Sequence, residues 1–190
     1  NATGADSDNY AVGVYAKTIN NFFSNGTVNA TSVAENGNAI AYGVAAGGEN
    51  QGNGAIGVFE NKGNLSVSTN SNLGNATSIG ILAYNGTISN FTNNGGNISV
   101  FANATSGYAN ATGISANNLG NFSNNKIITI SSKGKYAEAS GVHVSGNFTG
   151  PFENNGTIQV MATATGNATG YGVYAGQDIL GDFVNRGNSI

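Results

Sequence analysis

The sequence has no cysteine and few charged side chains. Without Cys, disulfide bonds and thiolate metal sites are excluded. Lys and Arg number 6 against 9 Asp and Glu, so the net charge of -3 comes without a basic patch for nucleic acid or an acidic membrane surface. No apolar run approaches the length of a membrane span. We therefore expect neither nucleic-acid binding nor membrane insertion of this segment.

Uncharged polar residues take the place of the missing charges. The 190 residues include 33 Asn, 30 Gly, 17 Ser and 16 Thr, and 39% of the chain is apolar. The apolar content is sufficient for the core of one domain, whereas amides and hydroxyls must keep the surface hydrated. Such a surface is unusual for a cytosolic protein.

A short segment opened by phenylalanine recurs along the chain. One copy is FENNGTIQV, which begins at Phe152, and a second anchor of Gly plus an aliphatic residue recurs in step with it. The interval is about 31 residues, with one insertion between Gly43 and Gly80, and such a period is typical of a solenoid. Residues 1–190 are expected to form a single repeat domain, an excerpt of a longer repeat protein or a stacking subunit. The phenylalanine anchors are Phe22, Phe59, Phe91, Phe122, Phe152 and Phe183.

Apolar residues alternate within each repeat, which is the period of a β-strand. Ile158 and Val160 exemplify this spacing after Phe152, and each repeat has room for three short strands. If repeats are successive coils, equivalent residues stack about 4.8 Å apart. The sequence thus predicts an all-β fold, a parallel β-helix (β-solenoid) of about six coils. One inward column is expected to contain Ile19, Ile56, Ile88, Leu119 and Leu180, with Phe148 at a shifted position.

The segment after each phenylalanine is interpreted as a corner of the coil. Phe152 would fill the interior, Asn154 and Asn155 would make the bend, and Gly156 would adopt a backbone shape that is costly for other residues. Ile158 would then resume the inward column. Equivalent asparagines could form an amide ladder from coil to coil, and a ligand-binding role for them is the alternative. That column contains Asn61, Asn93, Asn124, Asn154 and Asn185.

The motif Asn-x-Ser/Thr, the acceptor for N-glycosylation in secreted proteins, occurs more than twice as often as chance predicts. Because residues i and i+2 of a strand share a face, a pair such as Asn64 and Ser66 is also explained as an outward polar column. That alternative accounts poorly for the Asn-Ala-Thr triplets at Asn75, Asn110 and Asn167, which we expect at corners. The candidate sites are Asn1, Asn25, Asn29, Asn64, Asn75, Asn85, Asn90, Asn97, Asn103, Asn110, Asn121, Asn147, Asn155 and Asn167.

Residues suited to catalysis are few and scattered. The only histidine, His143, takes an outward position where other coils have Tyr15 and Tyr174, and we expect it to be a surface residue. Polysaccharide-cleaving β-helices need two or more carboxylates on one face. Glu60 and Glu153 share a column but lie three coils apart, about 14 Å, which is too far to act on one bond. We expect no enzymatic activity.

Metal ligands are also sparse. Asp6 and Asp8 could touch a calcium ion, but the spacing of an EF-hand is absent. Asp178 and Asp182 are equally isolated. We expect no metal site and no cofactor.

The chain resembles the β-helical passenger regions of bacterial autotransporters and filamentous haemagglutinin-like adhesins. The resemblance is carried by NNGTIQV and YNGTISN, together with GVYAK and GVYAG, and it extends over the whole chain. It implies an exported, non-catalytic shaft or adhesin at a cell surface. Its partners would be further repeats end to end, with glycans of a host or a neighbouring cell as a further possibility.

Other functions remain open at this point. The chain could be a repeating subunit of an extracellular filament, because the ends of a β-helix have unpaired strand edges. A face that binds ice or glycans is also considered. The outward polar positions that suggest it are chemically mixed and interrupted by Ile127, so it ranks below the structural functions. Those positions are Thr27, Asn29, Ser66, Thr129, Thr157 and Gln159.

Overall fold

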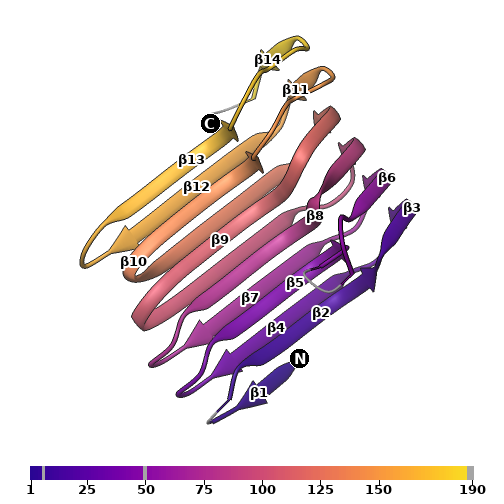
Figure 1. Cartoon of the computed structure of the whole chain (residues 1–190). Helices are drawn as coiled ribbons and strands as arrows, with labels where there is room; N and C mark the ends of the chain where they lie inside the picture. The colour runs from indigo at the N-terminus through magenta and orange to yellow at the C-terminus, as the bar shows by residue number, and fades with distance from the viewer. Residues whose placement is uncertain (6, 49–50, 188–190) are drawn as a thin grey trace.

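The computed structural model describes residues 1–5, 7–48 and 51–187, and over these residues the chain forms strands and turns with no helix. The strands lie side by side in successive coils (Figure 1). They are β1 (Ala2–Gly4), β2 (Asn9–Ala16), β3 (Thr18–Ser24), β4 (Val28–Ala34), β5 (Ala39–Ala46), β6 (Ala55–Asn61), β7 (Leu65–Ser71), β8 (Ala76–Asn93), β9 (Ile98–Asn124), β10 (Ile127–Val144), β11 (Phe152–Asn154), β12 (Thr157–Ala164), β13 (Ala168–Ala175) and β14 (Phe183–Asn185).

The strands pair in parallel from coil to coil, which confirms the predicted β-solenoid. The first face comprises β1, β4, β7, residues 98–104 of β9, residues 127–134 of β10, and β12. The second face comprises β2, β5, residues 76–83, 108–116 and 136–144, and β13. The third face contains β3, β6, residues 87–93 and 118–124, β11 and β14. In the middle coils these segments run on into one another, so that β9 alone turns through all three faces.

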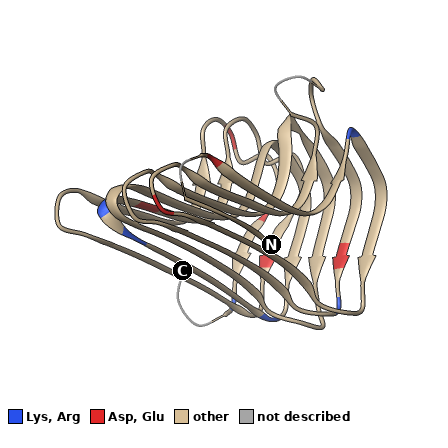
Figure 2. Cartoon of the chain, turned by 90° about the horizontal axis from the view of Figure 1, so that it is seen from below, with Lys and Arg blue, Asp and Glu red and all other residues tan. Residues whose placement is uncertain are grey.

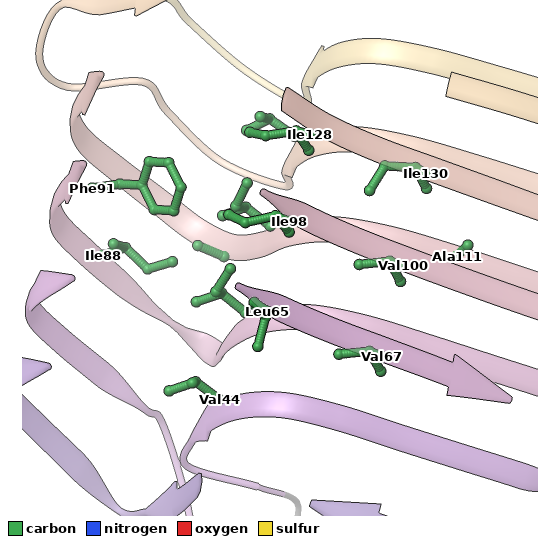
Figure 3. Packing of buried hydrophobic residues seen from close by; sticks show 14 of the residues in the cluster. Val44, Leu65, Val67, Ile88, Phe91, Ile98, Val100, Ala111, Ile128 and Ile130 are labelled. Carbon is green, nitrogen blue, oxygen red and sulfur yellow. The ribbon is translucent and has the colours of Figure 1, made fainter. Parts of the chain in front are cut away.

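The registers confirm most of the predicted columns. Ile158 pairs with Ile128 and Val160 with Ile130, in line with equivalent residues of the earlier coils. Figure 3 shows two such columns side by side, one from Leu65 to Ile128 and the next from Val67 to Ile130. The stacked aliphatic residues form a continuous core through the solenoid.

One column assignment was wrong. Phe148 pairs with Leu119 as predicted, but its partner in the last coil is Ile179, and Leu180 is 66% exposed. The column residue lies four positions before the phenylalanine in these two coils, instead of three. The extra residue falls in the non-strand segment before β11 in one coil and before β14 in the other.

The interior narrows where the first face meets the second. Ser32 Oγ donates to the carbonyl of Asn9 across this gap at 2.8 Å, and Ser132 Oγ donates to the carbonyl of Ala109 at 2.8 Å. A serine can bridge the two backbones only where they lie close together. This end of the coil is therefore filled by Ala, Ser and Thr69, and the larger side chains gather toward the third face.

A column of glycines on the second face makes room for the aliphatic residues of the first. A Cβ on Gly113 would lie 2.4 Å from the carbonyl oxygen of Gly141 and 2.9 Å from Ile130 Cδ1. A Cβ on Gly141 would lie 2.4 Å from Ile158 Cγ2. The backbone at these glycines has no positive φ, so close approach explains their presence.

The third face is held by stacked rings and stacked amides. Adjacent rings from Phe22 to Phe183 lie with centroids 4.3 to 5.4 Å apart and nearly parallel. Next to them, each buried asparagine donates from Nδ2 to Oδ1 of its counterpart in the next coil, at 2.7 to 2.9 Å. The amide ladder was predicted, and it runs from Asn61 to Asn185.

The predicted bend requires two corrections. Asn154 is the buried last residue of β11, so the bend itself is made by Asn155 and Gly156. Gly156 does not have a positive φ. It must be glycine because a Cβ there would lie 2.1 Å from the carbonyl oxygen of Lys126 in the coil before it.

The glycine column yields a stability prediction. We expect Gly113→Ala to lower the free energy of unfolding by about 1–3 kcal/mol, because the added methyl group meets backbone and Ile130. Gly26→Ala is the matched control, since no heavy atom lies within 4 Å of its Cβ position. It should be neutral or stabilising by up to about 1 kcal/mol. Urea unfolding monitored by circular dichroism measures both variants, and equal effects would contradict the packing described.

Candidate functional site

All eight tyrosines of the chain lie on the outer side of the second face or at its borders. They alternate with buried inward residues, as Tyr10 does with Ala11 and Tyr108 does with Ala109. Their positions in β2, β5, β8, β9, β10 and β13 are brought together only by the coiling. The tyrosines are Tyr10, Tyr15, Tyr42, Tyr84, Tyr108, Tyr136, Tyr171 and Tyr174.

One outward column of this face has small side chains between large ones. It was predicted from the position of His143, and the registers confirm it. Ala45 and Ser115 lie between bulkier neighbours, and Ala45 is only 1% exposed although it points outward. Larger residues around the column must therefore stand above it. The column contains Tyr15, Ala45, Leu82, Ser115, His143 and Tyr174.

The column forms the floor of a groove that runs across the strands. Two adjoining hollows of about 340 and 250 Å³ share Tyr42, Leu82 and Tyr84 as lining residues. Tyr10 and Tyr15 line the end toward the N-terminal coil, and the other end is lined by residues that include His143. We call this feature the tyrosine groove. Its further lining residues are Ile40, Ala45, Gly47, Gly48, Ile79, Ala83, Asn85, Ser115, Ala116, Asn117 and Ser145.

The predicted insertion between Gly43 and Gly80 forms part of the groove rim. It leaves the coil after β5, where Gly47 and Gly52 have φ of 74° and 76°, a conformation that favours glycine. The amide of Gly54 donates to the carbonyl of Tyr84 at 2.7 Å and so ties the insertion to the groove wall. The insertion thereby helps to hold Tyr84 in place.

The backbone is strained at one position of the rim. Asn85, with φ 47°, is the one residue other than glycine with a positive φ in the described part of the chain. The next residue, Gly86, cannot hold a Cβ because that atom would lie 1.5 Å from the carbonyl oxygen of Gly54. Asparagine tolerates this conformation better than most residues. At this turn the chain passes from the second face to the third.

The groove lining is mostly aromatic, small and polar, with His143 as its one histidine. Its lining residues include no Lys, Arg, Asp or Glu. Figure 2 shows how thinly the charged residues are scattered over the coils. The His143 ring stacks on Tyr174, with centroids 4.8 Å apart and planes 8° from parallel. Ser145 Oγ donates to Asn117 Oδ1 at 3.1 Å and orients that amide.

The carboxylates considered in the sequence are dispersed. Glu60 and Glu153 share a column on the third face, separated by Thr92 and Ser123. Glu60 forms an ion pair with Lys62 at 2.9 Å, and the hydrogen bonds from Lys62 and Asn94 lower the pKa of Glu60. Its carboxylate is thus engaged in a local contact.

The aspartates are not gathered either. Asp8 Oδ1 accepts a hydrogen bond from the backbone amide of Asn38 at 2.8 Å, and this contact joins the corners of two successive coils. Asp6 lies outside the described residues. Asp178 and Asp182 are exposed in the last coil. Among the described residues, no group of three or more His, Cys, Asp or Glu could hold a metal ion. The part of the chain that the structure describes also contains no membrane-spanning helix.

The asparagines of the 14 glycosylation motifs are all at least partly accessible, with none buried. Asn75 and Asn167 lie in turns just before second-face strands, as expected. The expectation for Asn110 was wrong, because Asn110 lies within β9 opposite Thr77. Several of these side chains also join coils: Asn75 Oδ1 accepts from the amide of Tyr108 at 2.9 Å.

The predicted outward polar positions of the first face lie on strands, except Thr27, which precedes the start of β4. Asn29, Ser66, Thr129 and Gln159 follow one column together with Ser99. They alternate along their strands with inward aliphatic residues such as Ile128 and Ile130, and none of them lines one of the three hollows of the described surface. The sequence interpretation missed the tyrosine groove on the adjacent face. The available signal was the alternation of tyrosines with inward alanines.

No family model, curated protein or solved structure matches this chain.

One tyrosine of the second face provides a pH prediction. Burial raises the pKa of Tyr108 above the ordinary value of 10.0, and the hydrogen bond to the Glu138 carboxylate and its charge raise it further. A raised folded-state pKa means that the stabilisation is complete below pH 10 and is lost as the pH rises through the folded pKa. We expect Glu138→Gln to lower the pKa of Tyr108 while burial keeps it above 10.0.

The measurement is the tyrosinate absorbance as a function of alkaline pH, for the wild type, Glu138→Gln and Tyr108→Phe. The component that Tyr108→Phe removes should titrate at lower pH in Glu138→Gln than in the wild type. Superimposable titration curves for the wild type and Glu138→Gln would refute the hydrogen bond between Tyr108 and Glu138.

Proposed function

We propose that this chain is a non-catalytic segment of an extracellular, elongated β-solenoid that serves adhesion at a cell surface. The observation that carries the proposal is a regular stack of coils whose surface is polar but nearly uncharged, with accessible glycosylation motifs throughout. A stack of this kind can be lengthened without changing its cross-section, since each coil contacts only its neighbours. Length and an accessible side surface are what an adhesive shaft requires.

The absence of catalysis is part of the proposal. It is supported by the local engagement of Glu60 and Asp8 in structural contacts and by the separation of the remaining carboxylates. N-glycosylation is proposed for the exposed motifs outside the tyrosine groove, foremost the Asn-Ala-Thr triplets of Asn75 and Asn167 in turns. Sugar chains at these turns would help to keep a surface with few charges soluble.

The test uses intact cells of the natural source. An antibody against the 190-residue chain should label cells that have not been permeabilised. Glycopeptide mapping of the recovered protein should find sugar at Asn75 and Asn167, and the mass of this region should exceed 19.0 kDa. Labelling only after permeabilisation would overturn the surface location. An unmodified mass would overturn glycosylation and leave these asparagines with their role between coils.

A filament subunit is the second candidate, and the stacked third face favours it. The phenylalanine stack is open at its ends, where Phe22 is half-buried and Phe183 is 41% exposed. The strands β2 and β13 pair on one side only among the described residues. A further coil, from the same polypeptide or from a second copy, can continue the stack at both ends. Contacts of this kind propagate instead of closing.

We therefore expect the 190-residue chain, expressed alone, to self-associate through its ends. A variant with a polar capping coil added at both ends should remain a monomer, because the open strand edges are then paired and covered. Light scattering and electron microscopy compare the two forms. A stable monomer of the uncapped chain at high concentration would contradict this expectation.

A further inference from the structure

The tyrosine groove has a length and a direction that suit a linear ligand. Its floor column passes from Tyr15 to His143 through five coils, which at about 4.8 Å per step is about 19 Å. We propose that the groove binds a neutral oligosaccharide along the solenoid axis. This inference rests on the proposed adhesive function for its biological setting and assigns the partner class that the adhesion would use.

The lining residues match the two kinds of surface that a sugar presents. The C–H faces of a pyranose ring are apolar and pack on aromatic rings, which Tyr42 and Tyr84 provide at the centre of the groove. Sugar hydroxyls need neutral donors and acceptors, which Ser115, Asn117 and Asn85 provide along the same groove. The contact of Asn117 with Ser145 holds that amide in position before a ligand arrives.

Two other ligand classes fit less well. Polyanions such as nucleic acid or sulfated and acidic glycans require Lys or Arg, and neither lines the groove. A peptide that binds by β-strand addition needs a free strand edge along its length. The strands β5, β8, β9 and β10 of the floor are already paired with a coil on each side, and among the described residues of the floor only β2, at the N-terminal end of the groove, has an unpaired edge. A neutral glycan needs neither a positive charge nor a strand edge.

The experiment uses the 190-residue chain made in a host without N-glycosylation, so that Asn85 carries no sugar of its own. The probes are arrayed neutral tetrasaccharides of glucose, mannose, galactose or N-acetylglucosamine, beside sulfated tetrasaccharides and aromatic-rich peptides. Bound probes are then titrated in solution. Isothermal titration calorimetry reads these titrations, because it reports binding independently of the fluorophores of each variant.

Three variants locate the binding. Tyr42→Ala should weaken the affinity for a bound neutral tetrasaccharide about tenfold, through the loss of one aromatic contact. Ser115→Trp, which keeps every tyrosine and fills the groove floor, should abolish binding. Tyr136→Ala is the matched control, an exposed tyrosine of the same face that does not line the groove, and it should bind as the wild type does. Circular dichroism verifies that each variant retains the β-solenoid.

Binding of a neutral tetrasaccharide with this order of variants supports the proposal. It is overturned if no neutral tetrasaccharide binds, if only peptides or sulfated sugars bind, or if folded Ser115→Trp binds as the wild type does. Equal losses in Tyr136→Ala and Tyr42→Ala would likewise overturn it. If the protein is on the cell surface but binds no sugar, only the proposed sugar site in the groove is refuted. If it binds sugar but is confined inside the cell, only the proposed surface function is refuted.

Discussion

The parallel hydrogen bonding between successive coils is the constraint on which the rest of the structure depends. It places each residue directly over its counterpart about one repeat away, at a spacing near 4.8 Å. At that distance equivalent side chains of successive coils are in contact. Three kinds of column make this contact favourable. Phenylalanine rings stack, asparagine amides bond head to tail, and aliphatic residues fill the space that the facing glycines leave open.

The same constraint explains the shortage of charge. A charged residue in a column would meet its own kind in the next coil, with repulsion at a spacing of about 4.8 Å. Asparagine avoids this problem because its amide both donates and accepts, so identical residues attract each other. Where carboxylates do occur, they stand apart: Glu60 and Glu153 are separated by two uncharged residues. The buried asparagine column thus provides polar contacts between coils without this repulsion.

In the outward columns the residue type varies from coil to coil, and the tyrosine groove is one result of this variation. Its floor changes from Tyr15 through Ala45 to Ser115 without disturbing the inward residues next to them. The insertion after β5 forms part of the groove rim, where the backbone amide of Gly54 donates a hydrogen bond to the carbonyl of Tyr84. A repetitive scaffold thereby has a local, non-repetitive feature, and that feature supports the proposal of a binding site.

The sequence by itself determined the fold, the coil length and the inward columns, because a strand period of two and a repeat near 31 residues leave one register in which like residues stack. It did not determine local detail. The four-residue spacing of the last two coils placed Ile179 in the column expected for Leu180, and crowding against Lys126 instead of backbone shape required Gly156. Only the tertiary structure decided that tyrosines from six strands would line one face, because outward residues are not constrained by stacking. Their neighbours depend on where each corner turns.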